Sequence, residues 1–285
     1  MAFNDGIPRI NCYSLSDLHD FDSCVFRFLV RHDLDKKYAI GKGSPQMALG
    51  VLLDKTIKII HSFGEKSYQA TPERLIGAVR YAAKKIIEEE KQSPKQPNFN
   101  TATVEFLTEE VLTAAENIFV NYLKEIKALN KSLGGVPFLQ KTVKIDGERY
   151  KLWGGPDTLE MGEDGIPEII DYKSRQDITK GKQNMDMDLM PKLYTLLMSE
   201  NLLKKGYKKA RFKVKFWQDP LDESFSIEYN LEDLLEVEEI FKEKIKKIKQ
   251  NKQISFCLLQ FCEACNHPES DDFMTQLENL GYSLE

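Results

Sequence analysis

The sequence predicts an α/β (α+β) fold, with a β-sheet flanked by helices and further helices ahead of it in the chain. Two observations support this class. Up to Leu133, apolar side chains recur mainly at helical spacing, whereas from Pro137 onward short alternating segments are separated by turn residues. With 285 residues, of which 41% are hydrophobic and 30% charged, the chain can form one large globular domain or two small ones.

The first part of the chain predicts four helices. In the stretch from Tyr13 to Leu34 the apolar residues fall on one helical face, and Ser14 with Asp17 resembles a capping box. Prolines and asparagines mark a loop, "QSPKQPNFN", between the third and fourth helices. The second, third and fourth helices are expected at about Gln46–Phe63, Pro72–Lys91 and Val104–Leu133.

The second part predicts strands joined by tight turns. Asp146-Gly147 is a hairpin dipeptide between two alternating segments, and the second strand is expected to continue through a kink at Gly154–Pro156 into "DTLEM". The turn "GEDG" then leads into the strand "PEIIDYKS". Four further elements are expected in order: a helix at about Met185–Lys204, the strand "KARFKVKFW", an edge strand "SFSIEY" and a charged helix at about Leu231–Asn251.

Composition excludes several classes of protein. The chain has no run of about 18 apolar residues, and its first residues lack a basic flank followed by an apolar segment, so we expect neither a membrane span nor a secretory signal. A formal charge of −5 gives no overall attraction to nucleic acid, so binding would require local basic patches. We therefore expect a cytoplasmic protein with no membrane partner.

Two aspartates are expected to meet across the "GEDG" turn. Folding that hairpin about its centre places Asp157 opposite Ile170 or Asp171, and alternation puts Lys173 on the same face as Asp171. Carboxylates this close repel each other unless a cation or a proton is shared, and Mg²⁺ prefers oxygen ligands of this kind. The alternative is an acidic hairpin on the protein surface, although the aliphatic "EII" before Asp171 favours a core strand.

A third aspartate lies in the second predicted helix. Asp54 follows the apolar run "MALGVLL", and Gly50, one turn earlier, costs about 1 kcal/mol of helix propensity relative to alanine. A buried acid beside a glycine indicates close approach to another group. The alternative is that Asp54 belongs to a solvated stripe with Lys55 and Lys58.

These motifs together resemble the PD-(D/E)XK nuclease superfamily, most closely its RecB-type and CRISPR-adaptation exonuclease branch. The resemblance rests on Gly154-x-x-Asp157, on the run Ile169–Lys173 and on the following helix that carries Tyr194. It implies a restriction-endonuclease-like core, a mixed central sheet flanked by helices, within a single nuclease-like domain spanning residues 1–285. Residues 70–133 then form a helical insertion, and residues 252–285 form a cysteine-containing tail.

The resemblance also implies roles for individual residues. Asp157 and Asp171 would bind Mg²⁺ or Mn²⁺, the Tyr172 carbonyl would be a further metal ligand, and Lys173 would be the catalytic lysine. Asp54, four residues after Gly50, stands where the family has a metal-binding histidine in Gly-x-x-x-His, and an oxygen ligand still suits either ion.

The helix after the lysine departs from the family pattern at one position. The family has Gln-x-x-x-Tyr there, and this chain has Met190 and Tyr194, so the glutamine is lost and the tyrosine kept. The resemblance implies that Tyr194 belongs to the catalytic site. Tyr194 is equally well explained as a core aromatic residue.

Five cysteines are too few for a paired disulfide framework in a chain of this length, and three lie between Cys257 and Cys265. Cys262-x-x-Cys265 is a half-site for zinc or an iron–sulfur cluster. Iron–sulfur members of the branch take one ligand from an N-terminal helix, where Cys24 lies here, and three from the tail. Asp271 stands where the last cysteine is expected.

Three outcomes remain open for these cysteines. Cys24, Cys257, Cys262 and Cys265 could hold a [4Fe–4S] cluster, and His267 could substitute for one of them and favour zinc. The third is that no metal binds and Cys24 is a small buried hydrophobic residue.

The sequence therefore predicts a Mg²⁺- or Mn²⁺-dependent deoxyribonuclease that acts on DNA ends or single strands. The alternative is a catalytically degenerate nuclease fold that binds nucleic acid or assembles a recombination, repair or CRISPR complex. The basic cluster expected to contact phosphate follows the motif closely. It comprises Lys173, Arg175, Lys180, Lys182 and Lys192.

Overall fold

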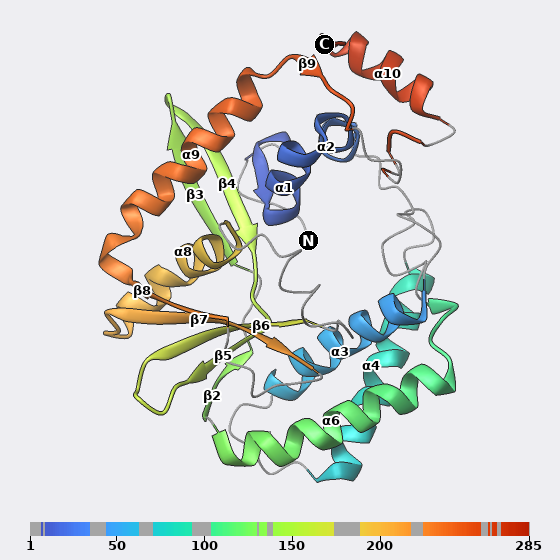
Figure 1. Cartoon of the computed structure of the whole chain (residues 1–285), viewed down its shortest axis with the longest axis vertical. Coiled ribbons are helices and arrows are strands. Elements are labelled where there is room, and N and C mark those ends of the chain that lie inside the picture. The colour runs from blue at the N-terminus through green and yellow to red at the C-terminus, as the bar shows by residue number, and fades with distance from the viewer. Residues whose placement is uncertain are drawn as a thin grey trace. The chain divides into compact units, whose positions relative to one another are not determined.

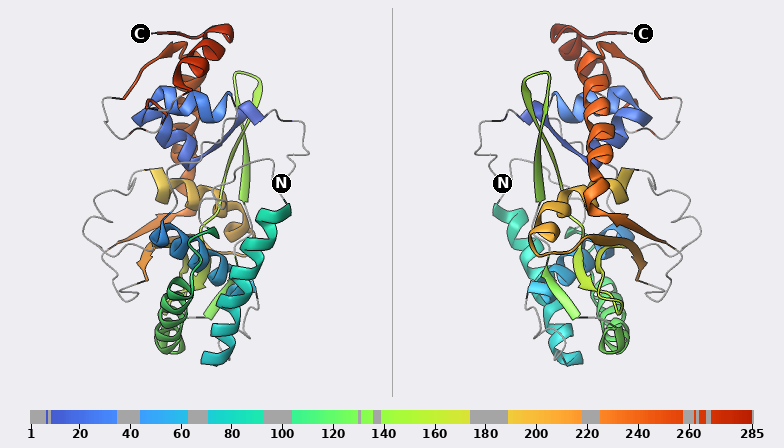
Figure 2. Two further views of the ribbon diagram at one scale, coloured as in Figure 1. Left: turned by 90° about the vertical axis from the view of Figure 1, so that its right-hand side faces the viewer. Right: turned by 90° about the vertical axis from the view of Figure 1, so that its left-hand side faces the viewer.

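The computed structural model (Figures 1 and 2) describes residues 7, 9–34, 44–62, 71–92, 104–129, 131–135, 139–173, 189–217, 225–257, 262, 264–266 and 269–284. The chain divides into two compact units. We call the first the terminal unit, which comprises residues 1–41, 138–154 and 235–285, and the second the central unit, which comprises residues 42–137 and 155–234. Within the described residues, no helix is both long and apolar enough to cross a membrane.

The central unit is built on a five-stranded sheet in the order β2-β5-β6-β7-β8. Its strands are β2 (Lys131–Gly135), β5 (Thr158–Met161), β6 (Pro167–Lys173), β7 (Lys209–Phe216) and β8 (Ser226–Asn230). The β6 and β7 strands are parallel and the other pairs are antiparallel. The expected mixed sheet with flanking helices is therefore confirmed.

The two faces of this sheet pack against different helices. On one face, Ile169 of β6 lies beside Phe212 of β7, and Phe212 contacts Tyr194 on α8 (Leu189–Lys204), with ring centroids 6.1 Å apart. On the other face, Ile170 and Tyr172 share one buried apolar cluster with three helices. These helices are α3 (Pro45–Ser62), α4 (Pro72–Gln92) and α6 (Glu109–Leu129).

The face covered by α3, α4 and α6 also carries buried charges where β6 and β7 meet. The Glu168 carboxylate of β6 forms ion pairs with the Lys213 ammonium at 2.8 Å and with the Arg211 guanidinium at 3.1 Å. Glu160 of β5 is likewise paired with Lys215, at 3.3 Å. Since these acids have basic partners on β7, they form a structural network that is separate from the Asp171 face.

The terminal unit contains a three-stranded sheet in the order β1-β4-β3. Its strands are β1 (Cys12–Ser14), β3 (Leu139–Ile145) and β4 (Glu148–Gly154), preceded by the 3₁₀ helix η1 (Arg9–Asn11). Asp146 and Gly147 form the β3–β4 turn with φ of 50° and 87°, which is the left-handed geometry expected of this dipeptide.

The remaining elements run from the central unit into the tail. The 3₁₀ helix η3 (Leu231–Asp233) leads into α9 (Leu234–Gln250). The tail contains β9 (Gln253–Ile254), α10 (Ser270–Asn279) and β10 (Ser283–Leu284), and its two strands pair in parallel. The expected charged helix and the edge strand β8 are thus present.

Two element boundaries differ from those expected, and a third falls outside the described residues. The second hairpin strand does not continue into "DTLEM": β4 ends at Gly154 and β5 begins at Thr158 in a different sheet. The fourth helix ends at Leu129 rather than Leu133, because residues 131–135 pair with β5 as strand β2, where two glycines disfavour a helix. Residues 185–188 of the helix expected from Met185 lie outside the described residues.

The stretch from Tyr13 to Leu34 forms two helices instead of one. They are α1 (Leu15–Ser23) and α2 (Val25–His32), separated by Cys24 in an extended conformation. The Ser14–Asp17 capping box is present at the start of α1, with both reciprocal hydrogen bonds. The single-domain organisation, the insertion at 70–133 and the tail at 252–285 remain predictions.

A buried polar group joins the N-terminal helices to the tail within the terminal unit. In the His32 ring, Nδ1 lies 2.8 Å from the Asp33 carboxylate and Nε2 lies 3.2 Å from the Cys12 carbonyl oxygen. The Tyr282 hydroxyl donates to the second oxygen of Asp33. Burial alone would raise the pKa of Asp33, but the hydrogen bonds from His32 and Tyr282 outweigh burial and leave that pKa lowered.

We predict that Asp33→Asn lowers the free energy of unfolding by about 2 kcal/mol at pH 7, because two hydrogen bonds to a buried charge are weakened. A lowered pKa in the folded state adds stability above the unfolded value of 3.8. That stability is lost as the pH falls through the lower, folded value. In urea unfolding, the difference from the wild type should therefore be constant above pH 5 or so and shrink below about pH 4.

Asp22→Asn is the control, because Asp22 is an exposed acid that pairs with Lys244 at the surface. It should change the free energy of unfolding by less than about 1 kcal/mol at every pH. An Asp33→Asn difference that is independent of pH would contradict the assignment of a lowered pKa.

Candidate functional site

Three aspartates from three elements of the central unit lie close together. Asp54 comes from α3, Asp157 from the segment just before β5, and Asp171 from the end of β6. Thr158 pairs with Ile170, so continuing the register by one residue places Asp157 opposite Asp171, as the sequence predicts. The Asp157 N–H donates to the Ile170 carbonyl at 2.9 Å, which fixes this part of the chain against β6.

The acids differ in their exposure to solvent. Asp157 and Asp171 are buried, with relative exposures of 8% and 4%, whereas the Asp54 side chain is 45% exposed. Asp54 therefore lies at the rim of the group. On the same helix, Leu52, Leu53 and Ile57 are buried and pack into the apolar cluster.

Asp157 is the acid most affected by its surroundings. Its Oδ2 accepts the backbone N–H of Tyr172 at 2.7 Å, which orients the carboxylate. Burial raises the pKa of Asp157 well above its usual value, and the charges of Asp171 and Asp54 raise it further. A carboxylate in this position is stabilised by sharing a proton or by binding a cation.

Two lysines contact these acids. The Lys173 ammonium contacts Oδ2 of Asp171. The Lys58 ammonium lies 2.6 Å from Oδ1 of Asp54 and 3.8 Å from Oδ1 of Asp157. Burial alone would lower the pKa of Lys58, but the charges of these two acids outweigh burial and leave that pKa raised.

Lys58 is a site residue that the sequence reasoning treated only as part of a solvated stripe. The signal that could have identified it was its spacing, since Lys58 lies four residues after Asp54 on one helix and so shares its face. Its contact with Asp157, however, depends on how α3 packs on the sheet. Sequence spacing alone does not supply that contact.

The two tyrosines predicted for the site lie in different environments. Burial raises the pKa of Tyr194, and the charges of the three acids raise it further, so its hydroxyl is neutral and near the acidic group. The Tyr172 ring points to the opposite face of the sheet and stacks on Trp217 with centroids 4.4 Å apart. Only the backbone of Tyr172 therefore takes part in the site, as the alternation of the strand predicts.

The donor set fits a divalent cation. Three carboxylates converge, two of them buried, and an oxygen-rich group of this kind is what Mg²⁺ and Mn²⁺ prefer. Lys58 already places one positive charge among them. The group therefore has the charge pattern of a cation site.

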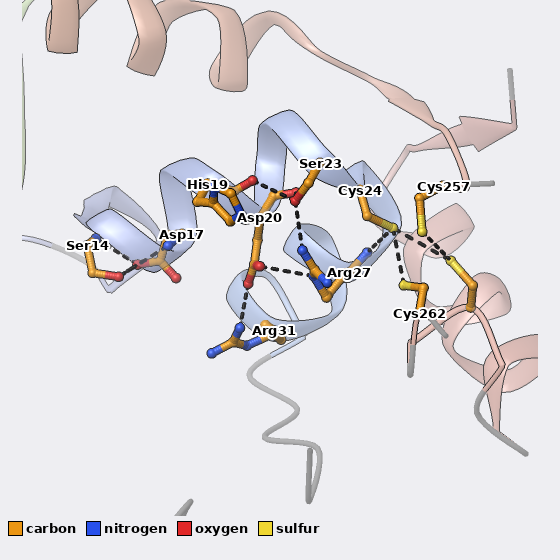
Figure 3. A network of polar contacts seen from close by, with 11 residues as sticks. Ser14, Asp17, His19, Asp20, Ser23, Cys24, Arg27, Arg31, Cys257 and Cys262 are labelled. Atoms are coloured by element: carbon orange, nitrogen blue, oxygen red, sulfur yellow. Dashed lines mark hydrogen bonds and ion pairs between the residues drawn. The ribbon is translucent and has the colours of Figure 1, made fainter. Parts of the chain in front are cut away.

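A second group, in the terminal unit, brings four cysteines together (Figure 3). The sulfur atoms of Cys24, Cys257, Cys262 and Cys265 all lie within 4.8 Å of one another. The Cys24 sulfur is 3.6 Å from that of Cys265 and 3.7 Å from that of Cys262, and Cys257 is 3.8 Å from Cys265. The set that the sequence singled out is therefore assembled without Asp271, which is exposed on α10.

The break between α1 and α2 positions the first of these thiols. Cys24 is the N-cap of α2, and its sulfur accepts the backbone N–H of Arg27 at 3.4 Å. The adjoining backbone is held by a hydrogen bond from the Phe26 N–H to the Ser255 carbonyl at 3.1 Å. These contacts join the start of α2 to the segment that carries Cys257.

The protonation of the thiols is uneven. Burial raises the pKa of Cys24, and burial also raises that of Cys265. Burial acts in the same direction on Cys262, but the backbone N–H of Cys265 and the neighbouring thiols outweigh it and leave the pKa of Cys262 lowered. Four thiols gathered this closely are a donor set for a thiophilic metal. His267 lies outside the described residues.

Most of the predicted basic cluster also falls outside the described residues, namely Arg175, Lys180 and Lys182. Lys192 is half-buried on α8. Elsewhere, many lysines have acidic partners. Lys204 pairs with Glu200 at 2.7 Å and Lys209 with Glu228 at 2.8 Å, so these side chains are neutralised within the protein.

Comparisons with known proteins identify one family. The family model described as the PD-(D/E)XK nuclease superfamily matches residues 13–270. No curated protein matches the chain.

Two solved structures show a weaker likeness. The crystal structure of SSO0001 is 11% identical, with a TM-score of 0.25, over 57% of this chain and 70% of that one. The crystal structure of Scheffersomyces stipitis Rai1 in complex with (3'-NADP)+ and calcium ion is 13% identical, with a TM-score of 0.19, over 94% of this chain and 69% of that one. Scores this low carry no argument.

Proposed function

We propose a function for this chain, which belongs to the PD-(D/E)XK nuclease superfamily. The proposal is a metal-dependent deoxyribonuclease that hydrolyses phosphodiester bonds at DNA ends or in single strands. The observation that carries it is the convergence of Asp54, Asp157 and Asp171 in the central unit, with Lys173 in contact with Asp171. Within the superfamily, the Gly154-x-x-Asp157 motif and the tail cysteines favour the RecB-type and CRISPR-adaptation branch.

The acids would hold Mg²⁺ or Mn²⁺, with the Tyr172 carbonyl as a further ligand. Such an ion lowers the pKa of a water and offsets charge on the phosphate. The Tyr172 N–H orients the Asp157 carboxylate, and strand alternation aims Asp171 and Lys173 at the same side of the sheet. The Lys173 ammonium supplies a positive charge beside the scissile phosphate, and the neutral Tyr194 hydroxyl can donate a hydrogen bond there.

A second candidate function has its own supporting observation. Lys58 already offsets the charges of Asp54 and Asp157, and the position of the family glutamine is taken by Met190, whose side chain is buried. A permanent lysine in place of the metal would leave a nuclease fold that binds nucleic acid or assembles a recombination, repair or CRISPR complex without cutting.

Incubation of labelled single- and double-stranded DNA with the protein and Mn²⁺ tests the first candidate. Asp171→Ala and Lys173→Ala should each reduce the cleavage rate by about 100-fold or more, because each removes a charge that acts on the transition state. Lys209→Ala is the matched control, since Lys209 is an exposed lysine paired with Glu228 on the next strand. Melting curves monitored by circular dichroism would confirm that each variant is folded.

Cleavage that survives both substitutions would contradict the catalytic assignment. DNA binding without cleavage under any metal condition would favour the second candidate. RNA of the same sequence in parallel reactions tests the preference for DNA.

The four thiols are proposed to bind a metal that joins α2 to the tail. A tetrahedral ion with metal–sulfur bonds of about 2.3 Å holds its sulfurs about 3.8 Å apart. The sulfur–sulfur separations of 3.6, 3.7 and 3.8 Å fit one such ion, most simply zinc. A [4Fe–4S] cluster, which the resemblance favours, binds each thiolate to a separate iron and would require the sulfurs to move apart.

Elemental analysis of protein purified without oxygen should therefore find about one zinc per chain, as expected for a four-thiolate site. Cys24→Ser and Cys265→Ser should lose the metal and lower the melting temperature by roughly 10 °C or more, because structural metal binding contributes directly to folding. Cys12→Ser is the control, since Cys12 is a buried cysteine of β1 outside the four-thiol group.

Four irons per chain with a charge-transfer absorbance would show instead that the thiols open around a cluster. Metal content that is the same in Cys12→Ser and Cys24→Ser would contradict a site at these four residues.

A further inference from the structure

Lys58 lies within the group of acids, although the proposed chemistry assigns it no part. It follows Asp54 by one helical turn on α3, and its ammonium is 2.6 Å from Asp54 and 3.8 Å from Asp157. Lys55, three residues earlier, is directed elsewhere and pairs with Glu89 of α4 at 2.6 Å. The two lysines of α3 therefore have different partners, and of these two it is Lys58 that contacts the acids of the proposed metal site.

The ammonium of Lys58 reduces the repulsion among these acids. The three carboxylates, two of them buried, repel one another and lose part of their hydration. A cation among them offsets both costs. Among the described residues, the Lys58 ammonium is a cation that contacts both Asp54 and Asp157.

We propose that Lys58 is a tethered counter-ion of the metal site, which a divalent ion must displace from Asp54 and Asp157 in order to bind. The inference rests on the proposed metal-dependent function and deepens it. Lysine suits this role because its charge sits at the end of a flexible four-carbon chain. The Lys58 side chain is 44% exposed, so its ammonium can move into solvent while its stem stays on α3.

This arrangement has two consequences that act in opposite directions. In the absence of metal, Lys58 stabilises the folded state by offsetting the charges of the acids. During metal binding it competes for the same oxygens, so the protein binds the ion less tightly than the acids alone would. A residue with a purely structural role would produce only the first consequence.

The experiment measures Mn²⁺ binding by calorimetry and thermal unfolding in EDTA, both without substrate. Lys58→Met, which keeps the length of the stem and removes the charge, should bind Mn²⁺ about tenfold more tightly than the wild type, because a partly exposed competing charge is lost. It should also melt at a lower temperature in EDTA. Adding Asp54→Asn to Lys58→Met should restore part of the melting temperature, since one repelling charge is removed.

Three variants serve as controls. Lys58→Arg keeps the positive charge and should bind Mn²⁺ within about threefold of the wild type. Lys55→Met removes a neighbouring lysine of the same helix and should change neither measurement. Asp157→Asn should abolish Mn²⁺ binding, which shows that the heat measured comes from this site.

The outcomes separate this inference from the proposed function. Loss of Mn²⁺ binding in Asp157→Asn together with unchanged or weaker binding in Lys58→Met would overturn the counter-ion role and leave the metal site intact. An absence of Mn²⁺ binding in every variant would overturn the metal-dependent function and the displacement together. Tighter binding in Lys58→Met but not in Lys55→Met or Lys58→Arg would support the inference.

Discussion

The mutual repulsion of Asp54, Asp157 and Asp171 is the constraint on which the central unit depends. Asp157 and Asp171 are buried, so their charges cannot be dispersed by water. The fold therefore provides compensation through Lys58, Lys173 and the Tyr172 N–H. A group of acids that is costly for folding but held in place by so many contacts is typical of a site that binds a cation.

The alternation of side chains along strand β6 separates these acids from the other charged residues of the strand. Asp171 and Lys173 face α8, while Glu168, Ile170 and Tyr172 face the helices α3, α4 and α6. On that second face, Glu168 is neutralised by lysine and arginine from β7. One strand therefore carries two sets of charges, Glu168 with its basic partners from β7 on one face and Asp171 with Lys173 on the other.

Much of the site could be predicted because strand periodicity and turn chemistry are local. Across the antiparallel turn between β5 and β6, the residue numbers of each pair add up to the same total, which places Asp157 opposite Asp171. Side chains alternate between the two faces of a strand, so the Tyr172 ring points away from these acids. The break at Cys24 was missed because the apolar spacing continues across it, and the strand at 131–135 because its partner β5 is distant in sequence. Both misses reflect interactions that helical periodicity does not report.

The sequence by itself determined which chemistry is available: the three aspartates, Lys173 and the four cysteines are all identifiable by residue type and local spacing. Only the tertiary structure decided which of the segments that are distant in the chain meet. Packing of α3 on the sheet brings Asp54 and Lys58 to Asp157, and the contact between Phe26 and Ser255 brings Cys24 to the tail thiols. The physical reason is that contacts between distant segments depend on how buried faces pack, and spacing along the chain does not encode that packing.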